Sequence, residues 1–185
     1  MTDVVLETGR LVLRRPAPRD YAGFEPFLRS ERASGIGGPN TSAQAWRIMC
    51  AELGHWTMLG YGMWAVTRKG DDTALGLVGP WTPGDWPENE IGWTIWNAAD
   101  EGSGIAAEAA EAAISHAWNV LKWDTMVSYV GADNHRSAAL AIRLGAVLDP
   151  DAPQPDPKNP CQVYRHPKPL NTADGAPRRQ QAVAP

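Results

Sequence analysis

The chain has 185 residues, of which 43% are hydrophobic and 21% charged, a composition typical of one globular domain with a sizeable core. Its formal net charge of -4 argues against nucleic acid as a partner. No run of about 20 apolar residues indicates a membrane span. Residues 1–10 lack the build of a secretory signal, so we expect a cytoplasmic protein that does not bind membranes.

The first half of the chain predicts a strand, two helices and a strand meander. Residues 6–15 alternate as a strand does, and prolines end it. Asp20 can cap a helix ending at Leu28, and Thr41 or Ser42 can cap a second helix over residues 43–59. The glycine-rich residues between these helices predict a loop over 34–40. Turn residues then separate three strand-like runs, which predict an antiparallel meander over residues 62–68, 74–81 and 90–96.

The pattern changes in the second half, where residues 105–121 are rich in alanine and have helical spacing. After this helix the sequence predicts a strand, a short helix and two more strands, over residues 125–130, 137–144, 146–148 and 162–166. From Lys168 onward the chain is polar and aperiodic. We therefore expect one domain over residues 1–167 and a disordered tail over residues 168–185.

Two cysteines, Cys50 and Cys161, are too few for a disulfide framework in a chain of this length. Each precedes a histidine by five residues, His55 and His166, so a zinc site has to be considered. Five residues turn a helix by roughly 140° and place strand side chains on opposite faces, so neither pair converges on one ion within regular structure. We expect reduced thiols and no metal.

The segment Gly102-Ser103-Gly104 stands between a predicted strand and the start of the alanine-rich helix. The first N–H groups of a helix lack intrahelical partners, and the helix dipole adds partial positive charge, so an anion can bind there. Glycines let a phosphate approach the backbone closely. Taken alone, such a turn is more often structural than functional.

A second segment sharpens this interpretation. Asn134-His135-Arg136-Ser137, followed by Leu144-Gly145, comes one strand after the alanine-rich helix. Together with residues 10–14, Glu90-Ile91-Gly92-Trp93 and the glycine turn, it resembles the GNAT superfamily of acyl-CoA-dependent N-acyltransferases, particularly the RimJ/RimL-like branch. The resemblance extends from Leu6 to about His166. It implies an α/β (α+β) fold with a mixed, largely antiparallel central sheet flanked by helices.

The resemblance also implies acetyl-CoA as co-substrate, with its pantetheine arm in a gap between the fourth and fifth strands. The backbone of Trp93, Thr94 and Ile95 would hydrogen-bond this arm, and Asn134 would touch it from the far side. The pyrophosphate would lie on the turn and the first helical residues, which are Gly102, Ser103, Gly104, Ile105 and Ala106.

The sequence departs from the family pattern at several positions. Ala99 stands where Arg or Gln is usual, and Asp100 and Glu101 bring negative charge close to the expected pyrophosphate. Two unit charges about 4 Å apart interact by roughly 1 kcal/mol in water and by several times that near a protein surface, so the two carboxylates would weaken binding unless they point to solvent. Ala141 stands where many members carry a tyrosine acid.

An acceptor amine arrives mostly as an ammonium ion and must lose a proton before it attacks. Glu90 is the first candidate for the base and Glu88 the reserve, although a solvated or salt-bridged carboxylate is an equally good interpretation of either. Ser137 could serve the departing thiolate, or could simply cap a helix. Trp56 and Trp81 are candidates for an apolar wall around the acceptor.

The predicted function is therefore transfer of an acetyl group from acetyl-CoA to a primary amine, by direct attack through a tetrahedral intermediate. The amine could belong to a protein N-terminus or to a small molecule. The alternative is a non-catalytic acyl-CoA-binding or regulatory domain on the same fold, favoured by Ala99, Asp100 and Ala141. A monomer and a homodimer are both compatible with the sequence.

Overall fold

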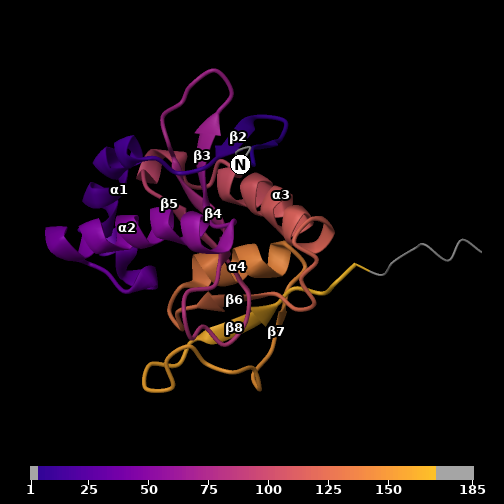
Figure 1. Cartoon of the computed structure of the whole chain (residues 1–185). Helices are drawn as coiled ribbons and strands as arrows, with labels where there is room; N and C mark the ends of the chain where they lie inside the picture. Colours follow the sequence, from indigo (N-terminus) through magenta and orange to yellow (C-terminus); the bar gives the residue numbers. More distant parts are fainter. Residues whose placement is uncertain (1–3, 170–185) are drawn as a thin grey trace, which may run out of the picture.

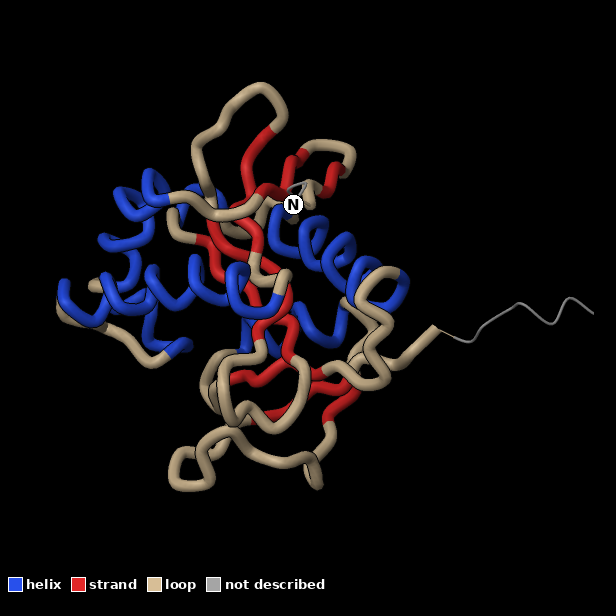
Figure 2. The backbone as a smooth tube through the Cα atoms, viewed as in Figure 1, coloured by secondary structure: helices blue, strands red, loops and turns tan. Residues whose placement is uncertain are grey.

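The computed structural model describes residues 4–169. It contains one eight-stranded sheet with helices on both faces, as Figures 1 and 2 show. This architecture confirms the predicted fold class. In spatial order the strands are β1 (Leu6–Glu7), β2 (Leu11–Arg14), β3 (Trp64–Arg68), β4 (Gly76–Trp81), β5 (Glu90–Ile95), β6 (Val127–Val130), β8 (Gln162–Arg165) and β7 (Val147–Leu148).

Four α-helices cover the sheet: α1 (Tyr21–Leu28), α2 (Ser42–Leu59), α3 (Ile105–Asn119) and α4 (His135–Arg143). Helices α1 and α2 lie on one side of the sheet and α3 on the other (Figure 1). Of the two caps that the sequence allows for α2, the structure uses Thr41, whose side chain accepts the N–H of Gln44. Short 3-10 turns occur at Pro18–Asp20, Glu31–Ile36 and Ala98–Asp100.

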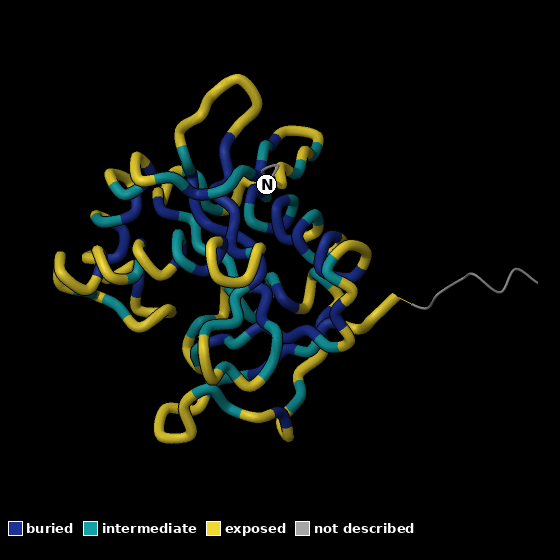
Figure 3. The backbone as a smooth tube through the Cα atoms, viewed as in Figure 1, coloured by how far each residue is buried: buried dark blue, intermediate teal, exposed yellow. Residues whose placement is uncertain are grey.

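The core has two main layers, one on each face of the sheet. Side chains of α1 and α2 pack with those of β3 and β4 on one face. On the other face α3 presents a flat stripe of alanines that are fully buried, so this helix can approach the strands closely. Figure 3 shows that burial concentrates along the central strands and the inner side of α3. The stripe consists of Ala109, Ala110, Ala113 and Ala117.

Several predicted boundaries were wrong. The first predicted strand is two strands, because the chain turns at residues 8–10 and the N–H of Thr8 donates to the carbonyl of Leu11 at 3.0 Å. Part of the predicted 34–40 loop belongs to a 3-10 turn. Helix α4 begins at His135 rather than Ser137, because Asn134 is its cap. Residues 170–185, most of the predicted tail, lie outside the described residues.

The sheet opens between β5 and β6. These parallel strands share one residue pair, Glu90 with Val127, whereas β4 and β5 share six. Beyond that pair, the Ser128 hydroxyl donates to the carbonyl of Ile91 at 2.7 Å. The Glu90 carboxylate accepts the backbone N–H of Tyr129, which a continuing parallel ladder would send to the Ile91 carbonyl. Side chains therefore replace the ladder, and the strands separate after Glu90.

Candidate active site

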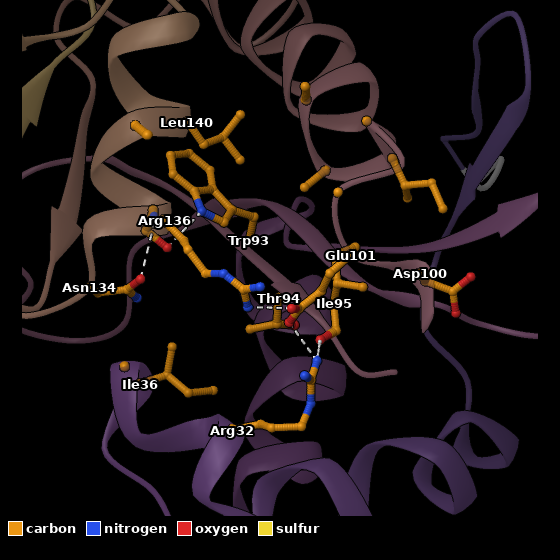
Figure 4. A pocket seen from close by; sticks show the side chains of 18 of the residues that line it. Arg32, Ile36, Trp93, Thr94, Ile95, Asp100, Glu101, Asn134, Arg136 and Leu140 are labelled. Carbon is orange, nitrogen blue, oxygen red and sulfur yellow. Dashed lines mark hydrogen bonds and ion pairs between the residues drawn. The ribbon is translucent and has the colours of Figure 1, made fainter. Parts of the chain in front are cut away.

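A cavity of about 510 Å³ lies where the two strands separate. Its volume falls in the range of small-molecule sites, about 300–1,000 Å³. Figure 4 shows side chains from β5, the start of α3, the start of α4 and the turn at Glu31–Ile36 converging on it. Most of the predicted cofactor residues line it, namely Trp93, Thr94, Ile95, Gly102, Gly104, Ile105, Ala106 and Asn134, together with Ser137.

Backbone groups of β5 face this cavity at alternate residues. Neighbouring residues of a strand direct their N–H and C=O groups to opposite edges. The N–H of Trp96 donates toward β4, whereas the carbonyl of Ile95 points the other way and accepts from Arg32 at 3.1 Å. Trp93 is two residues before Ile95, so its N–H and C=O face the same edge of the strand, and no residue of β6 pairs with it. Of the residues predicted to hydrogen-bond the cofactor through their backbone, Thr94 therefore directs its N–H and C=O toward β4, and Trp93 directs its own toward the opening.

The glycine turn has the backbone shape that its sequence predicts. Gly102 and Gly104 have φ values of 71° and 82°, in the left-handed region that favours glycine, and α3 begins directly after them. Ser103 is absent from the cavity lining, because its hydroxyl donates to the carbonyl of Asp100 at 2.5 Å and so closes the turn internally. The N–H groups of the first turn of α3 consequently open onto the cavity beside Ile105.

The two acidic residues of this loop are paired with arginines. Asp100 accepts from Arg68 at 2.9 Å. Glu101 accepts from Arg32 at 2.6 Å and also from Arg136 at the start of α4, and both arginines point at it in Figure 4. The charge that the sequence places beside the turn is thus compensated locally.

Helix α4 supplies the opposite wall. The Asn134 side chain accepts the N–H of Ser137 at 3.1 Å, so Asn134, and not Ser137, is the helix cap. The Ser137 hydroxyl accepts from the indole N–H of Trp93 at 3.2 Å, which leaves its own proton available to a group in the cavity. Ala141 is fully buried in a small apolar cluster, so this helix places no tyrosine hydroxyl at that position.

Glu90 lies at the closed end of the opening and does not line the cavity itself. Glu90 is 9% exposed, and its carboxylate accepts from the indole N–H of Trp86 at 2.7 Å. Burial raises the pKa of Glu90 to about 7, against the lowering effect of its bonds from Trp86 and the Tyr129 backbone. A carboxyl group with that pKa exchanges protons near neutral pH.

The reserve candidate has a different setting. Both oxygens of Glu88 accept from Arg165, at 2.7 and 2.8 Å, and one of them also accepts from Thr125. This pairing lowers the pKa of Glu88. A carboxylate held by a bidentate arginine is a weak proton acceptor, so of the two candidates only Glu90 is placed to exchange a proton.

Three arginines of the cavity were not predicted as site residues. Arg32, Arg136 and Arg143 line it, and a cluster of cations around a helix start is a setting for phosphate groups. Arg136 stands inside the quoted Asn134–Ser137 motif, and its position next to the cap was a signal for it. Arg32 lies in a distant turn, and nothing in its neighbours along the chain marks it.

The two tryptophans suggested for an acceptor wall do not line the cavity. Trp56 is buried, and its indole N–H donates to the carbonyl of Met63 at 2.8 Å. Trp81 is half-buried and stacks on His55 with ring centroids 5.1 Å apart. Trp81 packs in the layer beneath α1 and α2, whereas Trp56 packs edge-on against Trp64 in the cluster that includes α3.

Within residues 4–169, no group of three or more His, Cys, Asp or Glu side chains could hold a metal ion, and both cysteines are free. No helix in the same residues is long and apolar enough to cross a membrane.

Comparison with known proteins bears on these features. A model of the acetyltransferase (GNAT) domain matches residues 10–147. The chain belongs to the GNAT family of acetyltransferases. The crystal structure of an acetyltransferase from Agrobacterium tumefaciens str. C58 is similar, with 37% sequence identity and a TM-score of 0.83 over 90% of this chain and 95% of that one. This GNAT chain is accordingly an acyltransferase enzyme that uses acetyl-CoA.

More distant structures share the fold. A GNAT-family acetyltransferase from Bacillus anthracis has 17% identity and a TM-score of 0.68, over 88% of this chain and 96% of that one. RimL, described as a ribosomal L7/L12 alpha-N-protein acetyltransferase and solved with coenzyme A, has 15% identity and a TM-score of 0.68, over 88% and 97% of the two chains. At these identities the likeness concerns the fold alone.

Proposed function

We propose that this GNAT enzyme moves the acetyl group of acetyl-CoA to a primary amine by direct attack, with Glu90 as the base. The observation that carries the proposal is the opening between β5 and β6, where a free strand edge meets a helix start. A CoA thioester needs both features, because its pantetheine arm carries amide groups and its pyrophosphate is an anion. The cavity offers both within one volume.

Each residue then has a defined task. The N–H groups at Gly104, Ile105 and Ala106 bind the pyrophosphate, with Arg136 and Arg143 adding positive charge nearby. The backbone N–H and C=O of Trp93 bind the pantetheine end of the substrate, on the strand edge that β6 leaves unpaired. A donor on this edge is also the best placed to stabilise the developing oxyanion.

The proton path begins at Glu90. Its carboxylate takes a proton from the acceptor ammonium, directly or through one water, so that the nitrogen lone pair can attack the thioester carbonyl. As the C–S bond breaks, the nitrogen of the tetrahedral intermediate gives up its extra proton, which passes through water to the departing thiolate and leaves it as the CoA thiol. The Ser137 hydroxyl donates a hydrogen bond to that sulfur, since Trp93 already occupies a lone pair of its oxygen. Holding the two substrates in line supplies much of the remaining rate.

The acceptor is a primary amine of a protein N-terminus or of a small molecule. The description of RimL as an alpha-N-protein acetyltransferase supports testing an N-terminal peptide first. The test is a thiol-release assay with acetyl-CoA against a peptide with a free N-terminus, a polyamine, an aminoglycoside and simple alkylamines. Amine-dependent release of CoA with N-acetylated product seen by mass spectrometry would support the proposal. CoA that leaves the thermal transition unmoved, with no release for any amine, would contradict it.

A further inference from the structure

A second acidic side chain lies buried beside Glu90. Glu52, in the middle of α2, is 5% exposed. Its position belongs to the sheet-facing stripe of the helix, with the apolar Ala45, Met49 and Trp56, and His55 is the other buried polar residue of the helix. Glutamate is almost never fully buried unless it is paired, so an acid in this stripe requires a reason.

No partner explains it within residues 4–169. Glu52 Oε2 is buried and has no hydrogen-bond partner there. The pKa of Glu52 is raised to about 8, first by burial and then by the nearby negative charge of Glu90. No cation contributes to the pKa of either acid.

The groups around these two acids do not neutralise them. His55, one turn along α2, accepts the N–H of Thr82 at its Nε2, so its Nδ1 carries the proton that goes to the carbonyl of Tyr61. That tautomer is neutral, and burial lowers the pKa of His55. Arg165 is committed to Glu88 and Asp149.

The hydroxyl group of Tyr129, on β6, is a further oxygen near Glu90, whose charge acts on it. The hydroxyl of Tyr129 is buried and has no hydrogen-bond partner among the described residues. Burial and the negative charges of Glu88 and Glu90 raise the pKa of Tyr129, so it stays neutral. The same holds for the Cys161 thiol, whose pKa is also raised by burial and by Glu90. The one cation that acts on this cluster among the described residues is Arg165, which lowers the pKa of Tyr129 slightly and is itself paired with Glu88 and Asp149.

We infer that Glu52 and Glu90, with the Tyr129 hydroxyl, form the binding site for the acceptor's ammonium group. This inference rests on the proposed function and deepens it. An ammonium group has three N–H donors and one positive charge, which suits the Glu90 carboxylate together with the Glu52 and Tyr129 oxygens that have no hydrogen-bond partner among the described residues. The bound ammonium lowers the pKa of both acids, so Glu52 ionises as the acceptor binds. Glu90 then takes the proton, and Glu52 stays hydrogen-bonded to the neutral amine.

The site predicts a class of acceptor. Two acids in a buried setting repel an anion strongly, because charges interact more strongly away from water. An amine that carries a carboxylate on the neighbouring carbon is therefore a poor acceptor, whereas the same amine with that carboxylate blocked as an amide is a good one. Peptide N-termini and polyamines meet this condition, and free amino acids do not.

The β4–β5 connection covers the proposed site. Trp86, on this connection, covers Glu90 through its 2.7 Å hydrogen bond and packs edge-on against the Tyr129 ring, with centroids 5.8 Å apart. The residues before it, Gly84 and Asp85, are exposed and form a turn. An acceptor reaches the acids when this indole moves aside.

The test compares glycinamide with glycine, and the native enzyme with Glu52→Gln. In the native enzyme we expect acetylation of glycinamide at a kcat/KM at least about tenfold above that of glycine. In Glu52→Gln the KM for glycinamide should rise about 10- to 100-fold, as for loss of a charge-assisted hydrogen bond, while the KM for acetyl-CoA stays within about twofold. Glu111→Gln, an exposed glutamate on α3, is the matched control and should change neither constant.

The outcomes separate the two proposals. If no amine is acetylated, the proposed function fails and the inference with it. If amines are acetylated but Glu52→Gln keeps the native acceptor KM, or glycine serves as well as glycinamide, the inference alone is overturned. Glu52→Gln should fold, because it replaces a buried carboxyl group with an amide of the same shape, and its melting curve checks this. Glu52→Asp keeps the charge on a shorter arm and should recover part of the acceptor affinity.

Discussion

The cofactor end and the proposed acceptor end of this site differ in how their acidic side chains are compensated. At the cofactor end, the acids Asp100 and Glu101 are each held by arginines. At the acceptor end, Glu52 and Glu90 are more deeply buried, and no cation within residues 4–169 contributes to the pKa of either. A polyanion such as CoA requires the first arrangement, and a cation the second. The charge that a site leaves uncompensated therefore indicates the sign of the ligand that completes it.

Replacing Gly104 with Val tests the cofactor end and should have the largest effect. A valine at φ 82° is strained, and its side chain would stand where the phosphate meets the helix start. We expect the rise in melting temperature caused by CoA to disappear. Gly70→Val is the matched control, because Gly70 has φ 84° in open space in the turn before β4. An unchanged CoA affinity in Gly104→Val would contradict the assignment of this turn.

Glu90→Gln tests the acceptor end and should lower kcat by about 10- to 1000-fold, with acetyl-CoA affinity nearly unchanged. The amide keeps the shape and loses the base. Because the pKa of Glu90 is about 7, the native rate should rise with pH between about 6 and 8. The variant should lose this rise and recover in part at high pH, where more acceptor is already deprotonated. A higher acceptor KM with little pH dependence would instead indicate a positioning role.

The fold and the cofactor end were predictable because their signals are local. Periodicity located most of the helices and strands, and the glycine turn before an alanine-rich helix marked Gly102 and Gly104. The acceptor end depends on contacts between distant segments. The charge of Glu90, on β5, acts on Glu52, on α2, and a single acid in the stripe of Met49 and Trp56 was the one sign of it in the sequence. Glu88 and Glu90 could not be told apart from the sequence, because Arg165 lies far along the chain.

The uncompensated acids should also lower stability at high pH. Glu52 has a pKa of about 8 in the folded chain, above its usual value of 4.5, so its contribution to stability is complete below about pH 4.5 and is lost as pH rises from there through about 8. Between pH 7 and 9 this amounts to about 1 kcal/mol, or about 3 °C in melting temperature. Glu52→Gln should remove this decline. Parallel curves for the two proteins would show that Glu52 is ionised or solvated throughout.

The smallest effect is expected from Glu101→Gln. Glu101 holds Arg32 and Arg136 together across the mouth of the cavity, so its carboxylate competes with the phosphates of CoA for the same two guanidinium groups. Removing one negative charge near a bound polyanion should tighten CoA binding by about threefold at low salt, and the gain should shrink as salt screens the charges. Calorimetric titration with CoA at two salt concentrations measures this, with Glu111→Gln as the control. Weaker binding in Glu101→Gln would mean that Glu101 orients the arginines for the phosphates. In that case the pairing at the cofactor end is part of the binding site, and its acids serve the anion indirectly through the cations they hold.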